Sequence, residues 1–191
     1  MPDFDVIVLG AGAAGMMAGI EAGKRGRKVL VVDHARDPGE KIRISGGGRC
    51  NFTNVNATHT LGRERFLGQN PRFALSALSR YTPEMFIARV KKQGIAYHEK
   101  TLGQLFCDGP ATQIVSLLTN DLRAAGAAIW TGREVGSIEK TTDGFDVMIG
   151  DGRVTASSLV VATGGKSIPK MGATGLAYQI ARQFGLAVTD T

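Results

Sequence analysis

The 191-residue sequence is poor in cysteine and in aromatic residues, and it contains no long apolar run. Its two cysteines, Cys50 and Cys107, are too few for a disulfide framework and suit a reducing compartment. Every apolar run is far shorter than the roughly 20 residues of a membrane-spanning helix. The N-terminus carries Asp3 and Asp5 where an export signal carries positive charge. We therefore expect a cytoplasmic protein that has no membrane partner.

The remaining composition is that of a globular protein, with 43% hydrophobic and 21% charged residues. The formal net charge of +6 raises the question of a nucleic-acid partner. Lys and Arg are spread along the chain, however, and aromatic residues make up only 6% of it. We therefore expect no nucleic acid as a partner, and we assign part of the positive charge to an anionic cofactor.

The N-terminal stretch has a strand, a glycine turn, a helix, a second strand and an acid, in that order. An apolar run at 5–9 leads into Gly10-Ala11-Gly12-Ala13-Ala14-Gly15 and then into an alanine-rich helical segment. A second apolar run at 28–32 stops at Asp33. This arrangement is the dinucleotide-binding fingerprint. It predicts that a pyrophosphate lies at the helix N-terminus, against Gly10, Gly12, Ala13, Ala14 and Gly15.

The acid at the end of the second strand is expected to bind a ribose. Asp33 would accept hydrogen bonds from ribose hydroxyls, and its negative charge disfavours a 2′-phosphate at this place. His34 is a loop residue directly after Asp33, and we include it among the cofactor-binding candidates because it lies beside the acid that is expected to bind the ribose. Asp33 suits NAD as well as FAD, and a second feature is needed to choose between them.

Residues 41–54, KIRISGGGRCNFTN, form the most unusual stretch of the sequence. Three consecutive glycines free the backbone for close approach to a flat or anionic group, and Arg49 adds planar donors. A flexible surface loop is the plain alternative, but a linker would not normally combine Arg, Cys and Asn with its glycines. We favour a loop that contacts the cofactor, with the candidates Lys41, Ser45, Gly46, Gly47, Gly48, Arg49, Cys50 and Asn51.

The remainder predicts a helical insertion at about 61–125 and then an antiparallel meander with strands at 134–140, 144–149 and 153–157. A fully apolar strand at 159–162 follows, and it is typical of a buried parallel sheet. Ligands of open α/β sheets collect at the carboxyl ends of strands, so Ala162, Thr163 and Gly164 should face the same crevice as the fingerprint. The meander favours FAD, because plain NAD-dependent dehydrogenase domains lack it.

Three segments resemble a bacterial family of FAD-dependent oxidoreductases. They are Gly46–Asn51 followed by Thr53-Asn54, then Leu102–Asp108, then Ala162–Ser167. The family comprises HI-type conserved flavoproteins, variously described as aminoacetone-oxidase-like or as reductases of 3-dehydro bile acids. The resemblance covers essentially the whole chain. It implies FAD as cofactor, the backbone of Val135 beside the adenine, and a small-molecule substrate or an electron donor such as NAD(P)H.

The predicted fold class is α/β: a Rossmann-like FAD/NAD(P)-binding domain of the glutathione-reductase-like type, with a parallel sheet, an antiparallel meander and inserted helices. In the resembling family a substrate domain and a returning C-terminal segment follow the last strand. We therefore expect residues 1–191 to be the N-terminal part of such a domain. We also expect this chain by itself to hold FAD weakly and to turn over slowly or not at all.

No catalytic residue is predicted from the sequence. It has no Cys-x-x-Cys motif, no cluster of metal ligands around its three histidines and no nucleophile elbow. A flavin would itself perform the electron transfer. The leading hypothesis is an FAD-dependent oxidoreductase. The alternatives are an NAD-binding dehydrogenase domain and a non-catalytic nucleotide-binding module.

Overall fold

The computed structural model describes residues 1–66, 70–165 and 175–189. Lys166 and Ser167, which end the last resembling segment, lie outside these ranges. The chain divides into two compact units, the first made of residues 1–41 and 118–191 and the second of residues 42–117. The sequence predicts a helical insertion at about 61–125, whereas the second unit begins near Ile42 and contains strands as well as helices.

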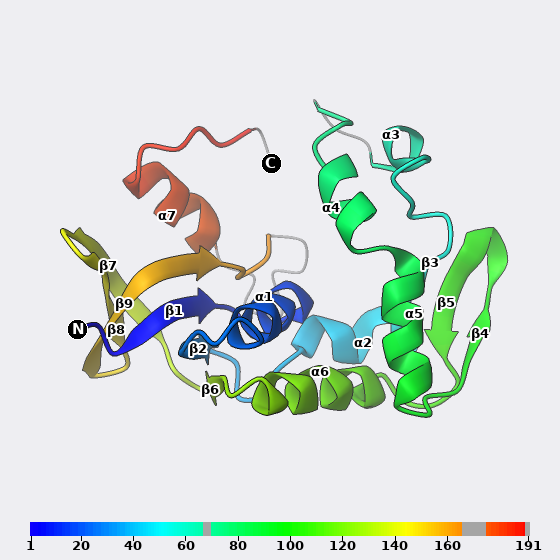
Figure 1. The fold of residues 1–191 in the computed structure, drawn as a ribbon, viewed down its shortest axis with the longest axis horizontal. Helices are drawn as coiled ribbons and strands as arrows, with labels where there is room; N and C mark the ends of the chain where they lie inside the picture. The colour runs from blue at the N-terminus through cyan, green and yellow to red at the C-terminus, as the bar shows by residue number, and fades with distance from the viewer. Residues whose placement is uncertain (67–69, 166–174, 190–191) are drawn as a thin grey trace. The chain divides into compact units, whose positions relative to one another are not determined.

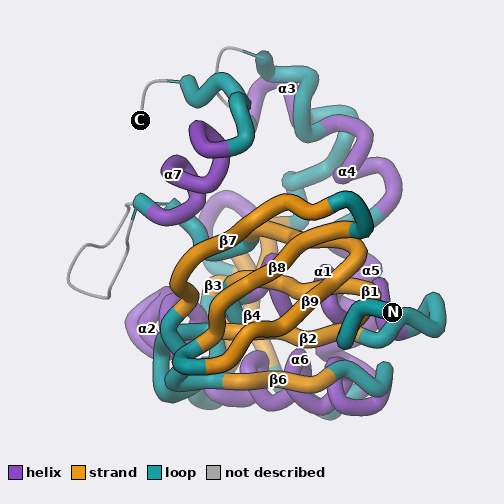
Figure 2. The backbone as a smooth tube through the Cα atoms, turned by 90° about the vertical axis from the view of Figure 1, so that its left-hand side faces the viewer, coloured by secondary structure: helices purple, strands orange, loops and turns teal. Residues whose placement is uncertain are grey.

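The first unit contains a six-stranded sheet in the order β6-β2-β1-β9-β8-β7. In Figure 2, β6 lies at the lower edge of this sheet and β7 at the upper edge. Its strands are β1 (Phe4–Leu9), β2 (Val29–Val32), β6 (Ala128–Trp130), β7 (Val135–Thr141), β8 (Gly144–Ile149) and β9 (Gly152–Val161). Its helices are α1 (Ala13–Gly23) and α7 (Leu176–Gln183), together with the later part of α6 (Thr112–Ala124).

The strands at one end of this sheet are parallel and those at the other end are antiparallel. β6, β2, β1 and β9 run parallel to one another, and β7 and β8 form an antiparallel meander with β9. The predicted combination of a parallel sheet and a meander is therefore confirmed. The sequence predicts separate strands at 153–157 and 159–162, whereas β9 is one continuous strand. Ala156 joins its two parts, because it pairs with Phe145 of β8 on one side and with Phe4 of β1 on the other.

Both faces of the sheet are covered. Ile7 and Leu9 of β1 belong to a buried cluster that includes side chains of the meander and Ile180 of α7. On the other face, Gly19 of α1 lies so close to β2 and α6 that an added Cβ would be 2.9 Å from a methyl group of Val31. Alternate residues of a strand point to opposite faces, so the apolar runs of β1 and β2 supply both layers of the core.

The second unit contains a small antiparallel sheet in the order β3-β5-β4, and α5 lies along one side of it (Figure 1). Its strands are β3 (Asn51–Asn54), β4 (Tyr97–Glu99) and β5 (Gln104–Cys107), and a short 3-10 helix, η1, spans Thr101–Gly103. Its helices are α3 (Gly62–Arg65), α4 (Leu75–Arg80) and α5 (Pro83–Lys92). α2 (Glu40–Gly48) and α6 each begin in one unit and end in the other.

Among the residues that the structure describes, no helix has the length and the apolar character that crossing a membrane requires.

Candidate functional site

The glycine turn between β1 and α1 is tightly packed at two of its three glycines. Gly10 has a φ of +105°, and a Cβ at this position would lie 2.5 Å from the carbonyl oxygen of Ala162. A Cβ on Gly15 would lie 1.8 Å from the carbonyl oxygen of Gly10. These approaches are too short for any side chain, so the fold itself requires glycine at both positions.

Gly12 differs from its two neighbours in the motif. It is the N-cap of α1, with a φ of −79° and a ψ of −173°, a conformation that any residue can adopt. Apart from its neighbours in the chain, no described residue has an atom within 4 Å of the place where the Cβ of residue 12 would be. The space in front of Gly12 is therefore open at the N-terminus of an eleven-residue helix, where backbone N–H groups and the helix dipole favour an anion.

Asp33 is held by the turns on either side of it. One carboxylate oxygen accepts a hydrogen bond from the backbone N–H of Ala11 at 2.6 Å, and the other accepts one from Ala35 at 2.9 Å. The imidazole Nδ1 of His34 lies 3.3 Å from the same carboxylate. A carboxylate has about four acceptor positions, so Asp33 can still accept hydrogen bonds from ribose hydroxyls.

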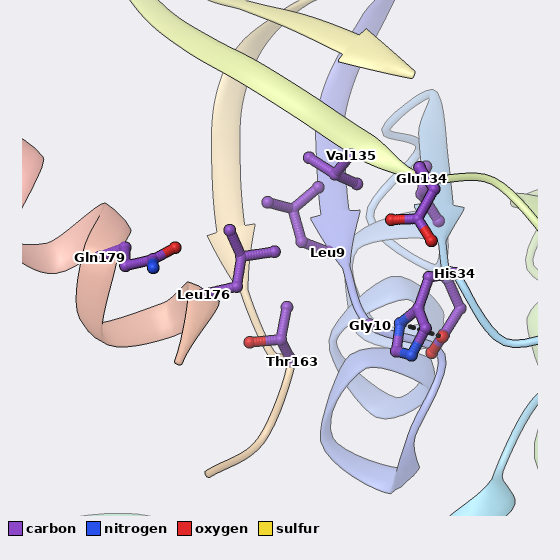
Figure 3. Close-up of a pocket in the computed structure, with 10 residues that line it drawn as sticks. Leu9, Gly10, His34, Glu134, Val135, Thr163, Leu176 and Gln179 are labelled. Carbon is purple, nitrogen blue, oxygen red and sulfur yellow. Dashed lines mark ion pairs between the residues drawn. The ribbon is translucent and has the colours of Figure 1, made fainter. Parts of the chain in front are cut away.

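A pocket of about 290 Å³ opens at the carboxyl ends of β1, β2 and β9. Figure 3 shows Leu176 and Gln179 of α7 on one side of it and His34 and Glu134 on the other, with Leu9 and Val135 between them. The full lining is Leu9, Gly10, Val32, Asp33, His34, Glu134, Val135, Thr163, Leu176 and Gln179. An apolar pocket that carries a few polar groups at the ends of parallel strands is typical of a nucleotide site.

This pocket brings together five of the residues predicted from the sequence: Gly10, Asp33, His34, Val135 and Thr163. Sequence reasoning missed Glu134, Leu176 and Gln179. No motif marks the two α7 residues, whose spacing is that of an ordinary amphipathic helix. Glu134 directly precedes β7, and only the pairing of the meander places it at the pocket.

The hydroxyl of Thr163 is a further sign of a ligand. Its Oγ1 atom is buried and has no hydrogen-bond partner among the described residues. A buried polar atom without a partner is destabilising by about 1–3 kcal/mol. Thr163 lines this pocket, so a polar group of a bound molecule would relieve that penalty.

Three more predicted residues lie near the fingerprint in the first unit. The backbone N–H of Ala162 donates to the carbonyl oxygen of Leu9 at 2.8 Å. The Lys41 ammonium donates to the carbonyl oxygen of Gly165 at 3.2 Å, and a Cβ on Gly164 would lie 3.4 Å from the same ammonium nitrogen. Lys41 therefore brings a positive charge to the turn after β9, as an anionic ligand would require.

The predicted glycine loop, Ser45–Asn51, belongs to the second unit. Ser45 leaves the helical conformation, and Gly46, Gly47 and Gly48 have φ values of 58°, 67° and 84°. Gly46 packs against Phe106, whose ring carbon would lie 2.5 Å from a Cβ at that position. The sequence predicts one loop over 41–54, whereas the first residues of this stretch belong to α2 and its last four form β3. The contact of this loop with a cofactor stays a prediction.

The two cysteines are buried thiols that flank the β3–β5 pairing. The register pairs Asn51 with Phe106, and the backbone N–H of Cys107 donates to the Arg49 carbonyl oxygen at 2.9 Å. Burial, with smaller effects of Cys50 and Asp108, raises the pKa of the Cys107 thiol to about 11. Burial also raises the pKa of Cys50 above its ordinary value. Both thiols are therefore protonated at neutral pH and are poor nucleophiles.

Comparison with known families identifies the family and the fold of the chain. The family model described as the HI0933-like protein Rossmann domain matches residues 4–191. The chain belongs to this family. The predicted fold class and the predicted family are thus both confirmed, and the domain is a Rossmann domain.

Relatives and a solved structure extend the comparison. A protein of Escherichia coli named ribosomal RNA dihydrouridine synthase is 48% identical over 191 residues, which are 100% of this chain and 47% of that protein. A 3-dehydro-bile acid delta(4,6)-reductase of Clostridium scindens is 27% identical over 93% of this chain and 43% of its own length. The halogenase PltM, solved with phloroglucinol and FAD, matches with a TM-score of 0.55 at 21% identity, over 98% of this chain and 37% of that one. The chain thus spans about half the length of the curated relatives it matches.

Proposed function

We propose that this chain is the FAD-binding part of a flavoenzyme that reduces a uridine of ribosomal RNA to dihydrouridine. The observation that carries the cofactor half of the proposal is the open space at Gly12 beside the pocket of Asp33 and Thr163. When bound, FAD supplies the hydride chemistry, and the protein supplies position and electrostatics. Gly12 and the α1 N-terminus would hold the pyrophosphate, Asp33 the ribose, and Val135 and Leu176 the adenine.

The substrate half of the proposal is supported by similarity along the whole chain. The relative with 48% identity is named for dihydrouridine formation in ribosomal RNA, whereas the bile-acid reductase is only 27% identical. The proposal replaces our expectation that nucleic acid is not a partner. Saturating the C5–C6 double bond of uracil takes a hydride and a proton. A donor such as NAD(P)H would therefore be oxidised once for each dihydrouridine formed.

The test uses the full-length, FAD-loaded protein with NADPH or NADH and ribosomal RNA from cells that lack its gene. Digestion of the RNA to nucleosides and mass spectrometry measure dihydrouridine, and absorbance measures the consumed nicotinamide. We expect one dihydrouridine for each nicotinamide oxidised. The matched control is Gly12→Val, which should remain folded, lose FAD and form no dihydrouridine.

Three results would each point elsewhere. Nicotinamide oxidation with artificial acceptors but intact uridine would keep the oxidoreductase and exclude this substrate. A colourless protein that binds NAD tightly would favour an NAD-dependent dehydrogenase. FAD binding without turnover of any acceptor would favour a non-catalytic nucleotide-binding module.

A further inference from the structure

The net positive charge of the chain belongs to its second unit. Residues 42–117 contain ten Lys and Arg but only four Asp and Glu, a net charge of +6. The first unit contains thirteen basic and thirteen acidic residues, a net charge of zero. Basic residues are indeed spread along the sequence, but only those of the second unit lack an equal number of acids. This unit therefore produces a field that attracts polyanions.

Part of this charge lies beside exposed aromatic rings. Phe73 is 86% exposed and Phe66 is 39% exposed, although large apolar side chains are normally buried. Each of the two follows an exposed arginine in the sequence, Arg72 and Arg65 respectively. Together with the exposed Arg80 at the end of α4, these residues lie on α3 and α4 or directly next to them. We call this set of exposed residues the α3–α4 surface: Arg65, Phe66, Arg72, Phe73 and Arg80.

The backbone of α3, of α4 and of the turn before α4 determines where these side chains are attached. α3 and α4 lie side by side (Figures 1 and 2). Gly62 allows this approach, since a Cβ there would lie 2.6 Å from a methyl group of Leu75. The side-chain oxygen of Asn70 accepts a hydrogen bond from the Arg72 N–H at 3.1 Å, and its carbonyl oxygen accepts one from Phe73 at 3.0 Å. Arg72 and Phe73 are thus presented by an ordered turn just before α4.

The arginines of this surface are not neutralised locally. Among the ion pairs of the described residues, none includes Arg65, Arg72 or Arg80. Between residues 61 and 80, Glu64 is the one acid in the sequence. Cations that lack an acidic partner are available to phosphate groups, for which the planar guanidinium is well suited.

We propose that the α3–α4 surface binds a single-stranded segment of the substrate RNA. The arginines would contact phosphates, and Phe73 would stack on a base, since every base offers a π-face to an aromatic ring. An apolar protein partner would explain the phenylalanines but not the arginines between them. The choice of RNA as the occupant rests on the proposed function.

The experiment measures binding of a fluorescein-labelled, single-stranded 20-nucleotide RNA to the full-length, FAD-loaded protein by fluorescence anisotropy. Phe73→Ala should weaken binding about tenfold, the value of one stacked base. Arg72→Gln should lower the slope of log K against log salt by about 0.7, the value of one phosphate contact on a single strand. The matched controls are Leu186→Ala and Arg27→Gln, exposed residues of the first unit that should leave both quantities unchanged.

Each outcome decides something. Unchanged binding in the Phe73 and Arg72 variants, with a wild-type protein that binds RNA and forms dihydrouridine, would overturn the surface and keep the proposed function. Loss of FAD or a lowered melting temperature in these variants would show that protein covers the surface, and would also overturn it. A wild-type protein that neither binds RNA nor forms dihydrouridine would overturn both proposals.

Discussion

Gly12 and Gly15 are three residues apart in one motif, yet substituting them should affect different properties: FAD binding for Gly12 and stability for Gly15. The Cβ that Gly12→Val adds would have no atom within 4 Å except those of its neighbours in the chain. Loss of a good N-cap destabilises a helix by about 0.5–1 kcal/mol, and the more restricted unfolded chain returns about 0.4–1 kcal/mol. The free energy of unfolding of the FAD-free protein should therefore change by less than about 0.5 kcal/mol.

The same variant should lose FAD, because the valine methyl groups would occupy the space that a pyrophosphate needs. We expect at least a hundredfold weaker binding, equivalent to about 2.8 kcal/mol. Gly15→Ala is the matched variant. Its Cβ would lie 1.8 Å from the Gly10 carbonyl oxygen, so α1 must move away from β1. Such overpacking destabilises a protein by about 1–3 kcal/mol, which would lower its melting temperature before any FAD is added.

The assay is a fluorescence titration of each purified variant with FAD, together with thermal unfolding of the FAD-free proteins. We expect Gly12→Val to melt at the temperature of the parent and to bind no FAD, whereas Gly15→Ala should melt at a lower temperature. If Gly12→Val bound FAD as tightly as the parent, the assignment of the fingerprint to the pyrophosphate would be refuted. If the melting temperature of Gly12→Val were lowered as much as that of Gly15→Ala, the conclusion that the space at Gly12 is open would be refuted.

Two further predictions concern single side chains. Asp33→Asn leaves one of two backbone N–H groups without an acceptor, so we expect a loss of about 1–3 kcal/mol in stability, measured by denaturant unfolding. We also expect weaker FAD binding, measured by titration, and unchanged FAD binding would contradict the ribose role. Cys107 keeps its proton in the folded protein up to a pKa of about 11, above the ordinary value of 9.0, so its contribution to stability is complete below pH 9 and is lost as the pH rises to about 11. From pH 9 to about 11, the free energy of unfolding should fall by up to about 2.7 kcal/mol more in the parent than in Cys107→Ala. Parallel curves of this free energy against pH would show that ionisation of the thiol does not change the stability of the fold.

Local signals in the sequence were sufficient for the fingerprint. The apolar runs and the glycine spacing predict β1 and β2 within about a residue and a helix between them, because the turn chemistry and the strand pattern there agree with each other. They also identified Asp33 and Thr163 as pocket residues. The sequence does not predict the continuity of β9, because the polar pair Ser157-Ser158 interrupts the strand pattern. Only pairing with β1 and β8 on its two sides carries the strand through it.

What the sequence concealed depends on contacts between distant residues. Gln179 lines the pocket because of the packing of α7, and Glu134 lines it because of the pairing of the meander. Neither of these contacts produces a recognisable spacing of residues in the sequence. The separation of charge was hidden for the same reason, since a list of basic residues does not tell which of them share a unit. Once Ile42 and Leu117 mark the limits of the second unit, the imbalance follows from counting.

The position of β9 beside β1 has a consequence for synthesis on the ribosome. β2, the other neighbour of β1, ends at Val32, but β9 ends only at Val161. At a synthesis rate of roughly 5–20 residues per second, the second edge of β1 stays unpaired for about 6–26 s before β9 is complete. During that interval an apolar strand presents unpaired N–H and C=O groups, which are a template for pairing with another chain. The second unit is contiguous in the sequence, so it can fold while β1 is still waiting. Slower translation of residues 118–161 should therefore lower the soluble yield more than slower translation after residue 161.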